Sequence, residues 1–297
     1  MGVLLTSRRV VLTWLLLLLV QACGHGTGGS AALSVVDDAG DTVRLDHPAR
    51  RIVSLAPAST ELLFAIGAGP AVVGRTRWCD YPAAALEVPS VGDGIQPSIE
   101  AVAARHPDLV VLYHSAQNAS AREQLGRLGI PTVDLALDRV QDFERAGHLL
   151  GTLTGHASDA DTMLAAFQTR LAAATRPAGG HPPSVLILVW DQPPMTIGSG
   201  SFLSEIVERA GGRNLFADLA ASAGVISVEA VVARRPDLVL VSSDSEPAFA
   251  KRPEWQTVPA VRDRRFVHVN SSAFNRPSPR MPEAISELAA KLESATR

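Results

Sequence analysis

The chain has 297 residues, a formal net charge of −3, 19% charged and 46% hydrophobic residues. This length and composition predict a globular protein with enough apolar sequence for two lobes of ordinary size. Because the chain has no basic run and only 5% aromatic residues, it lacks the features of a nucleic-acid-binding surface, and no nucleic acid is expected among its partners.

The N-terminus has the pattern of an export signal. Arg8 and Arg9 precede an apolar stretch from Val10 to Val20, which is shorter than the roughly 20 residues of a membrane span. The sequence Val-Gln-Ala-Cys ending at Cys23 resembles a bacterial lipobox, in which the cysteine is lipidated and becomes the first mature residue. Residues 1–23 are therefore predicted to be a lipoprotein signal peptide.

Two alternatives concern this segment. The apolar stretch also fits an uncleaved signal anchor. The arginine pair fits a twin-arginine signal as well as a general secretory one, so the export route is open. If Cys23 is lipidated, Cys79 is the only other thiol and no intrachain disulfide forms. Cys79 is then a reactive thiol or, as we favour, a small buried filler.

Residues 24–50 are predicted to be a tether and a short hairpin. Gly24 to Ser34 is rich in glycine, serine and alanine, and Val35 to Leu45 alternates around a turn at residues 38–41.

Residues 51–138 are predicted to form an N-terminal α/β lobe. Strands and helices alternate along it, which favours a parallel sheet with helices on its faces. The expected elements are a strand from Arg51, a helix capped by Ser59 and ending at Ile66, a strand from Ala71 to Gly74, a loop from Arg75 to Pro82, a helix from Gln117 to Leu128 and a strand from Ile130 to Leu135.

One motif occurs twice, at Ser98–Leu112 and at Ser227–Val241. Ten of the fifteen positions are identical. In each copy a serine precedes a short apolar helix, and a proline ends that helix before a β-branched run. Each copy therefore predicts a helix-turn-strand unit, and the repetition indicates a duplicated architecture.

Glu100 and Glu229 lie in the first turn of the two repeated helices, beside the apolar stripe, and should be exposed. A single acid here is stabilised by the helix dipole by roughly 0.3–1 kcal/mol and needs no partner. Two matched copies favour instead one acidic projection on each half of the molecule.

Residues 139–177 carry helical patterns only and are predicted to connect the lobes. The second helix, from about Ala157 to Arg176, would be about 30 Å long. Residues 178–297 repeat the lobe plan as a C-terminal α/β lobe. Its expected elements are a strand from Ser184 to Trp190, a loop over residues 191–194, a helix ending at Gly211, the second repeat, a strand from Arg265 to Asn270, a loop to Pro282 and a helix from Glu283 to Ala295.

Open α/β sheets bind ligands at the carboxyl ends of their strands. The loops expected at that edge carry Trp78, Tyr113, Trp190, Phe274 and Arg276. Each aromatic side chain alone is as compatible with a core position. Together, two facing lobes with such loops predict a cleft for a sizeable, partly apolar ligand. Arg276 either pairs with an acidic group of the ligand or makes a surface salt bridge.

Several motifs form a specific set. They are Ser54–Gly67, Asp80-Tyr81-Pro82, both repeats, Gly200–Glu205, Ala210–Asn214 and Arg276–Arg280. Through them the chain resembles, from Arg51 to its end, the periplasmic-binding-protein family of ABC importers for vitamin B12, ferric siderophores and haem. The motifs at Asp80 and from Phe274 to Arg280 are most similar to those of members that bind vitamin B12. One departure is that Val91 to Ile95 lacks an aromatic residue expected in one wall of the cleft.

The resemblance implies two Rossmann-like lobes with parallel sheets, joined by a single long backbone helix. It implies a lipoprotein, monomeric and without cofactor or catalytic residues, that captures a cobalamin, ferric-siderophore or haem type of metal chelate. Its partners would be an ABC permease and the ATPase subunits, at the outer side of the cell membrane. The implied ligand-binding residues are Ser59, Trp78, Tyr113, Trp190, Phe274, Arg276 and Arg280, and Glu100 and Glu229 would dock the permease.

Two other functions stay open. A zinc or manganese receptor of related fold would need histidine and carboxylate ligands from both lobes, and His114 stands at a strand end without an evident partner. A thiol-dependent enzyme would use Cys79. Against an enzyme, the sequence contains no Gly-x-Ser-x-Gly elbow, no Walker loop and no His-Glu-x-x-His motif.

Overall fold

The computed structural model describes residues 32–177, 180–270 and 272–296. The predicted signal peptide, Cys23 and most of the tether lie outside these ranges. In the described part of the chain, no helix is both long and apolar enough to cross a membrane. The first described element is an antiparallel hairpin of β1 (Leu33–Val36) and β2 (Thr42–Leu45), as predicted.

The N lobe comprises the elements from β3 to β6 and the loop after β6. Its four-stranded sheet has the order β4-β3-β5-β6 and is entirely parallel. The predicted parallel sheet is thus confirmed here. Its elements are β3 (Ile52–Ser54), α2 (Pro57–Ala65), β4 (Val72–Arg75), α3 (Ile99–Ala103), β5 (Leu109–Tyr113), α4 (Ala119–Arg127) and β6 (Thr132–Leu135).

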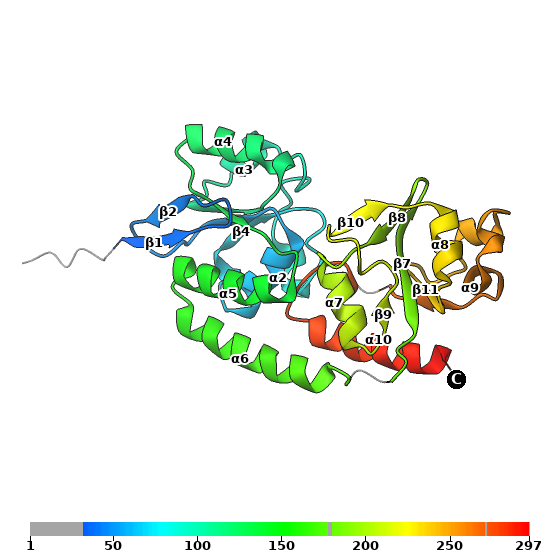
Figure 1. Cartoon of the computed structure of the whole chain (residues 1–297). Helices are drawn as coiled ribbons and strands as arrows, with labels where there is room; N and C mark the ends of the chain where they lie inside the picture. The colour runs from blue at the N-terminus through cyan, green and yellow to red at the C-terminus, as the bar shows by residue number, and fades with distance from the viewer. Residues whose placement is uncertain (1–31, 178–179, 271, 297) are drawn as a thin grey trace, which may run out of the picture.

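The C lobe comprises the elements from β7 to the C-terminal helix. Its sheet has the order β10-β8-β7-β11-β12, with β9 paired to β7. Figure 1 shows α7 and α10 on one side of this sheet and α8 and α9 on the other. The elements are β7 (Ser184–Asp191), β8 (Pro194–Ile197), α7 (Phe202–Arg209), β9 (Arg213–Asn214), β10 (Ala223–Val225), α8 (Val228–Arg234), β11 (Leu238–Val241), α9 (Pro259–Arg262), β12 (Phe266–His268) and α10 (Met281–Ala295).

The fold class is confirmed, but the second sheet is mixed. Strands β9, β7, β11 and β12 run parallel, whereas β8 and β10 are antiparallel. The stretch from Asp191 to Pro194, expected to be a simple loop, is the tight connection of a β7–β8 hairpin. A connection this short permits only an antiparallel pairing. The two prolines there concealed the second strand, because proline usually argues against a strand.

The predicted caps of the repeated helices are confirmed. The Ser98 hydroxyl accepts a hydrogen bond from the N–H of Ala101, and the Ser227 hydroxyl accepts one from the N–H of Ala230, both at 3.2 Å. The predicted cap at Ser59 is wrong, since α2 begins at Pro57 and Ser59 is fully buried in its first turn. Proline is well suited to the first helical position, and it moved the start of the helix upstream.

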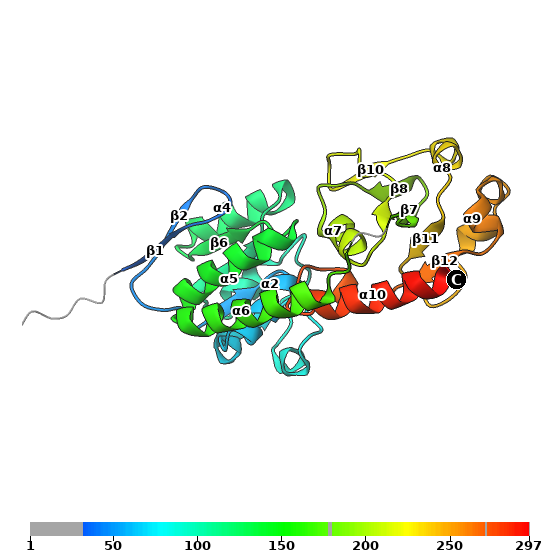
Figure 2. The same cartoon turned by 60° about the horizontal axis from the view of Figure 1, so that its bottom comes forward.

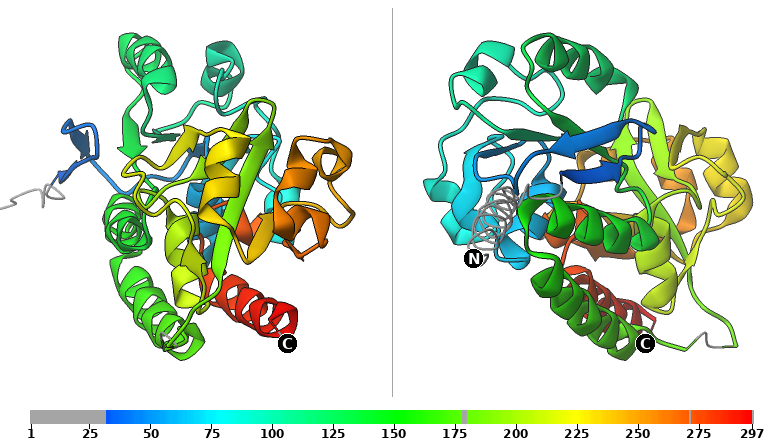
Figure 3. Two further views of the ribbon diagram at one scale, coloured as in Figure 1. Left: turned by 45° about the vertical axis from the view of Figure 1, so that its right-hand side comes forward. Right: turned by 90° about the vertical axis from the view of Figure 1, so that its left-hand side faces the viewer.

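Two helices lie between the lobes in the chain, and the second is the long backbone helix that joins them. Helix α5 (Val140–Thr154) ends at Gly155, which has a φ of +75°, and α6 (Ala157–Ala174) follows it. Figure 2 shows α6 leading from the N lobe toward the C lobe. In both views of Figure 3, α6 and α10 lie side by side along one edge of the molecule. Buried residues of α6, including Phe167, share one hydrophobic core with Ile52 of the N lobe and Leu288 of α10.

Candidate functional site

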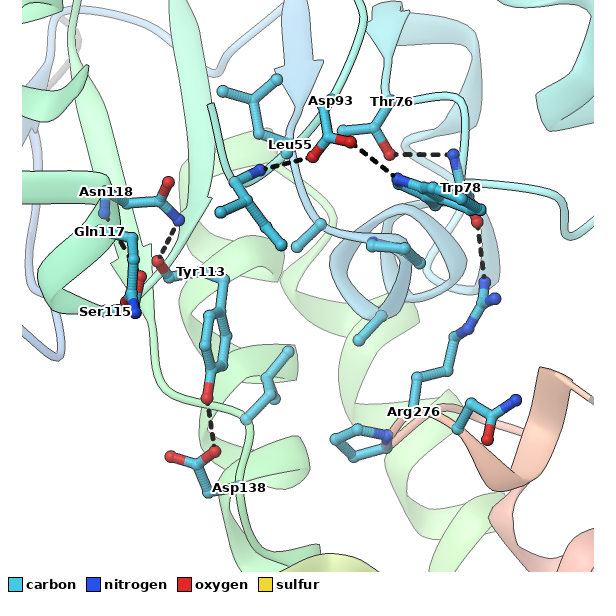
Figure 4. Close-up of a pocket in the computed structure, with 18 of the residues that line it drawn as sticks. Leu55, Thr76, Trp78, Asp93, Tyr113, Ser115, Gln117, Asn118, Asp138 and Arg276 are labelled. Carbon is cyan, nitrogen blue, oxygen red and sulfur yellow. Dashed lines mark hydrogen bonds between the residues drawn. The ribbon is translucent and has the colours of Figure 1, made fainter. Parts of the chain in front are cut away.

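A cavity of about 540 Å³ lies between the lobes, at the carboxyl ends of β3, β4 and β5 (Figure 4). This position follows from the parallel sheet, whose loops all emerge at that edge. Most of its wall comes from the N lobe: Leu55, Ala56, Pro57, Ala58, Thr76, Trp78, Asp93, Gly94, Ile95, Tyr113, Ser115, Gln117, Asn118, Leu137 and Asp138. The C lobe adds Phe202, Asn275, Arg276 and Pro277.

Trp78 forms an aromatic wall of the cavity and is 57% exposed. Its Nε1 donates a hydrogen bond to Asp93 Oδ2 at 3.2 Å, while the N–H of Ile95 donates to Asp93 Oδ1 at 2.9 Å. The pKa of Asp93 is lowered below its usual value. The hydrogen bond from Ile95 has the largest effect, and that from Trp78 and the nearby Arg77 add to it. Asp93 is therefore a carboxylate at neutral pH and fixes the tryptophan ring.

The wall that was expected to lack an aromatic side chain is built by Asp93, Gly94 and Ile95. A Cβ atom on Gly94 would lie 2.3 Å from the carbonyl oxygen of Leu55, so only glycine permits this close approach. None of these three residues was predicted to line the cleft. The signal that points to this wall is the pair Gly92 and Gly94, which marks a turn around the acid.

Tyr113 and Asp138 form the facing wall. The hydroxyl of Tyr113 donates to Asp138 Oδ1 at 2.6 Å. Burial, together with this hydrogen bond and the charge of Asp138, raises the pKa of the Tyr113 phenol well above its usual value. Tyr113 is thus a neutral hydrogen-bond donor, and Asp138 is a lining residue that the sequence analysis did not identify.

Asn118 lines the cavity, and its side chain supports the end of β5. Its side chain is buried, and its Nδ2 donates to the carbonyl oxygen of Tyr113 at 2.8 Å. Because only the nitrogen of the amide can donate to a carbonyl oxygen, this contact fixes the orientation of the amide. Its Oδ1 has no hydrogen-bond partner among the described residues and is covered by protein atoms.

The two predicted arginines lie where the lobes meet. Arg276 lines the cavity, and its Nη1 lies 2.9 Å from Asp80 Oδ1 and 3.4 Å from Glu61 Oε1. Arg280 does not line the cavity and pairs with Glu61, whose side chain is 1% exposed. Arg276 was expected either to pair with a ligand or to form a salt bridge, and the structure shows it in a salt bridge within the protein. Its side chain is 13% exposed.

Besides Arg280, three predicted ligand contacts lie outside this cavity. Trp190 lines a smaller one of about 280 Å³ at the carboxyl ends of β7 and β11, where its Nε1 donates to the carbonyl oxygen of Gln192. Phe274 is 1% exposed and belongs to the core that packs on α10. Ser59 is fully buried, and neither it nor Phe274 lines either cavity. The loop position of Phe274 suggested a contact, but the chain turns its ring inward.

Cys79 packs beneath the site. It is fully buried, and its Sγ lies 3.0 Å from Thr60 Oγ1 and 3.2 Å from Thr76 Oγ1. Thr60 also donates to Ser54 Oγ at 2.8 Å, so the thiol belongs to the packing that joins β3 to α2. The cavity is not lined by this thiol.

Metal-binding side chains are dispersed. Within the described ranges, no group of three or more histidine, cysteine, aspartate or glutamate residues is arranged to hold a metal ion. His114 contacts Asp134 at 3.4 Å, and the same carboxylate oxygen lies 2.7 Å from Arg122 Nη1.

The two repeated glutamates are exposed, as predicted, one on each lobe. Glu100 lies in α3 and Glu229 in α8. Both helices lie away from the edge along which α6 and α10 run (Figure 1). The backbone N–H of Glu229 and the hydroxyl of Ser227 lower the pKa of Glu229, which keeps it ionised.

Known proteins with a similar sequence or structure are binding proteins. The chain is 27% identical over 254 residues to the vitamin B12-binding protein of Vibrio parahaemolyticus, covering 85% of this chain and 92% of that protein. It is 31% identical over 269 residues to an uncharacterised ABC transporter substrate-binding lipoprotein of Bacillus subtilis, covering 86% and 83%.

Two solved structures have the same fold. The apo periplasmic haem-binding protein of Roseiflexus superposes with a TM-score of 0.75 at 26% identity, covering 84% of this chain and 99% of that one. The periplasmic vitamin B12-binding protein of Vibrio cholerae gives 0.66 at 26% identity, with the same coverage. The family model for periplasmic binding proteins matches residues 52–273, and the chain therefore belongs to the periplasmic binding protein family.

Proposed function

We propose that this protein is the substrate-binding component of an ABC importer and captures a metal chelate of the cobalamin, ferric-siderophore or haem type. The observation that carries the proposal is the interlobe cavity with Trp78 and Tyr113 in its wall. Its volume of about 540 Å³ lies within the usual range for small-molecule sites. The names of the similar proteins support the ligand class, and the burial of Cys79 argues against a thiol-dependent enzyme.

The test is direct binding to residues 24–297, which leave out the predicted signal peptide and lipidated cysteine. Cyanocobalamin, ferrioxamine B and haemin are titrated separately while the tryptophan fluorescence of the protein and the absorption of the chelate are recorded. We expect saturable binding of at least one of them, and weaker binding by Trp78→Ala. Leu128→Ala is the control, because Leu128 is an exposed apolar residue that does not line the cavity. Absence of saturable binding by all three would contradict the proposal.

We propose further that Glu100 and Glu229 dock the permease. Each is an exposed carboxylate in the first turn of a helix, and the two lobes present one each. A permease with two-fold symmetry would offer one basic site to each carboxylate. Charged pairs of this kind set the orientation and the rate of encounter more than the affinity.

The docking proposal is tested with a Glu100→Ala, Glu229→Ala double variant. It should bind ligand as the wild type does, yet fail to stimulate ATP hydrolysis by the reconstituted transporter. The matched control is Glu123→Ala, Glu254→Ala, which also removes one exposed carboxylate from each lobe. If the Glu100→Ala, Glu229→Ala variant stimulates ATP hydrolysis as strongly as the wild type does, the two glutamates only stabilise the first turns of their helices.

We also propose that the protein is a monomer held at the outer side of the membrane by a lipid on Cys23. The sequence Val20 to Cys23 supports the anchor. Lipidation supplies apolar contact with the bilayer at about 0.8 kcal/mol for each buried methylene. Cys23→Ser should move the protein from the membrane fraction to the soluble fraction. Equal membrane retention would favour the signal anchor instead.

A further inference from the structure

The charged side chains that line the cavity have a net negative balance. They are Asp93, Asp138 and Arg276. The arginine is already paired with Asp80 and Glu61, and Arg280, the second cation of this cluster, pairs with Glu61. Two arginines and two carboxylates thus balance within the cluster. Asp93 and Asp138 are left in the wall. Asp93 pairs with the exposed Arg77, whereas Asp138 forms no salt bridge with an arginine of the described ranges.

The same wall is rich in hydrogen-bond acceptors. Asp138 accepts from Tyr113, and a carboxylate has further lone pairs available. Two donors of the wall, the hydroxyl of Tyr113 and the Nε1 of Trp78, are already engaged with carboxylates. The neutral side chains of Ser115, Gln117 and Asn275 can either donate or accept.

We propose that this cavity selects chelates whose periphery donates hydrogen bonds through amide or ammonium groups and carries no ionised carboxylate. The inference rests on the proposed function and narrows its ligand class. An amide or ammonium group can donate to Asp93 and Asp138, whereas a carboxylate meets these two carboxylates and finds Arg276 already paired. Specificity of this kind comes from unfavourable contacts with the wrong ligand as much as from favourable ones with the right one.

Haem falls in the disfavoured class. Its two propionates are ionised at neutral pH. Haem iron also needs an axial side chain such as histidine, cysteine, methionine or tyrosine. Of these types, the described lining residues include only Tyr113, whose phenol donates to Asp138 and resists ionisation. A chelate whose own atoms saturate the metal needs no such ligand from the protein.

The experiment compares matched probes that differ in one group. Cyanocobalamin is paired with its monocarboxylic acids, made by mild hydrolysis of peripheral amides. Ferrioxamine B, which carries an ammonium group, is paired with its N-succinyl derivative. Dissociation constants are measured by calorimetry at low and high salt. In the series whose parent binds, we expect the carboxylate derivative to bind at least tenfold more weakly, with a smaller ratio at high salt.

Variants test whether the two carboxylates of the cavity wall cause this difference in dissociation constants. Asp93→Asn, Asp138→Asn removes both charges and leaves one carbonyl acceptor at each position, for Tyr113 at residue 138 and for either Trp78 or the N–H of Ile95 at residue 93. The ratio should then fall at least threefold. Asp218→Asn is the control, since Asp218 pairs with Arg234 and does not line the cavity. A carboxylate derivative that binds within twofold of its parent, or an unchanged ratio in the double variant, overturns this inference alone. Failure of both parents to bind while haemin binds also overturns this inference alone. Failure of both parents and of haemin overturns it together with the proposed ligand class.

Discussion

Arg280 and Glu61 form a two-point ion pair between the lobes. Nε of Arg280 lies 2.8 Å from Oε2 of Glu61, and Nη2 lies 2.5 Å from Oε1. Glu61 belongs to α2 of the N lobe, whereas Arg280 immediately precedes α10 of the C lobe. The guanidinium also lies over the ring of Tyr81, 4.0 Å from its centroid. The buried carboxylate therefore depends on the other lobe for its counter-charge.

We expect Arg280→Ala to destabilise the protein strongly. Removing one partner of a buried ion pair leaves an uncompensated charge and costs roughly 3–5 kcal/mol, and the remaining contact with Arg276 should place the effect near the lower value. Urea denaturation followed by circular dichroism measures it. Arg170→Ala is the matched control, because Arg170 forms an exposed pair with Glu283 that should contribute about 0–1 kcal/mol. Equal losses for the two variants would refute the buried role of Glu61.

Phe274 and Trp78 should respond differently to truncation. Phe274→Ala removes a core ring and should lower the free energy of unfolding by about 3–5 kcal/mol. Trp78→Ala should leave the free energy of unfolding nearly unchanged, because the ring is exposed in the cavity. It should weaken binding of any chelate that the wild type binds by about 1–3 kcal/mol. Thermal unfolding and calorimetric titration of both variants check this. A Phe274→Ala variant of normal stability that has lost binding would place the ring in the site after all.

Gly94→Ala should disturb the cavity wall. The added methyl group would meet the carbonyl oxygen of Leu55, so the segment carrying Asp93 and Ile95 must move. We expect weaker binding and a loss of about 1–3 kcal/mol of stability, which is typical of steric strain in a packed site. Gly126→Ala in α4 is the control, because its Cβ meets nothing within 4 Å and alanine should stabilise that helix by about 0.5–1 kcal/mol. Unimpaired binding by Gly94→Ala would mean that this wall does not contact the ligand.

Two carboxyl groups should give opposite pH dependence. Burial raises the pKa of Asp134 above 3.8. Asp134 therefore adds to the free energy of unfolding below pH 3.8, and this addition is lost as the pH rises through the folded-state pKa. Burial also opposes ionisation of Asp237, but the hydroxyl and N–H of Ser184 outweigh it and lower the pKa. Asp237 therefore adds to the free energy of unfolding above pH 3.8, and this addition is lost as the pH falls through the folded-state pKa.

Urea denaturation across about pH 3 to 6 separates the two groups. Relative to wild type, Asp134→Asn should make the free energy of unfolding rise more with pH above 3.8. Asp237→Asn should make it rise less with pH below 3.8. Parallel profiles for wild type and both variants would contradict these assignments.

The sequence predicted the features that depend on local chemistry. Ser98 and Ser227 cap their helices as expected, and the parallel order of the N lobe follows from the alternation of its elements. The errors arose where distant residues decide the outcome. Phe274 is drawn into a core shared with α10, and β8 pairs with β7 despite its prolines. Polar partners across the cavity, such as Asp138 for Tyr113, leave no periodic pattern and were missed.

The shared core around α6 limits where residues can be inserted into this chain. The 18 residues of α6 span about 27 Å and pack on α5, at least from Ala160 to Phe167, and on α10. One inserted residue would rotate everything after it by about 100° and advance it by about 1.5 Å. Phe167 and Leu171 would then lose their places in the core, and Glu229 would turn relative to Glu100. Relatives of this chain should therefore vary in length at surface turns such as residues 38–41, while the length of α6 stays constant.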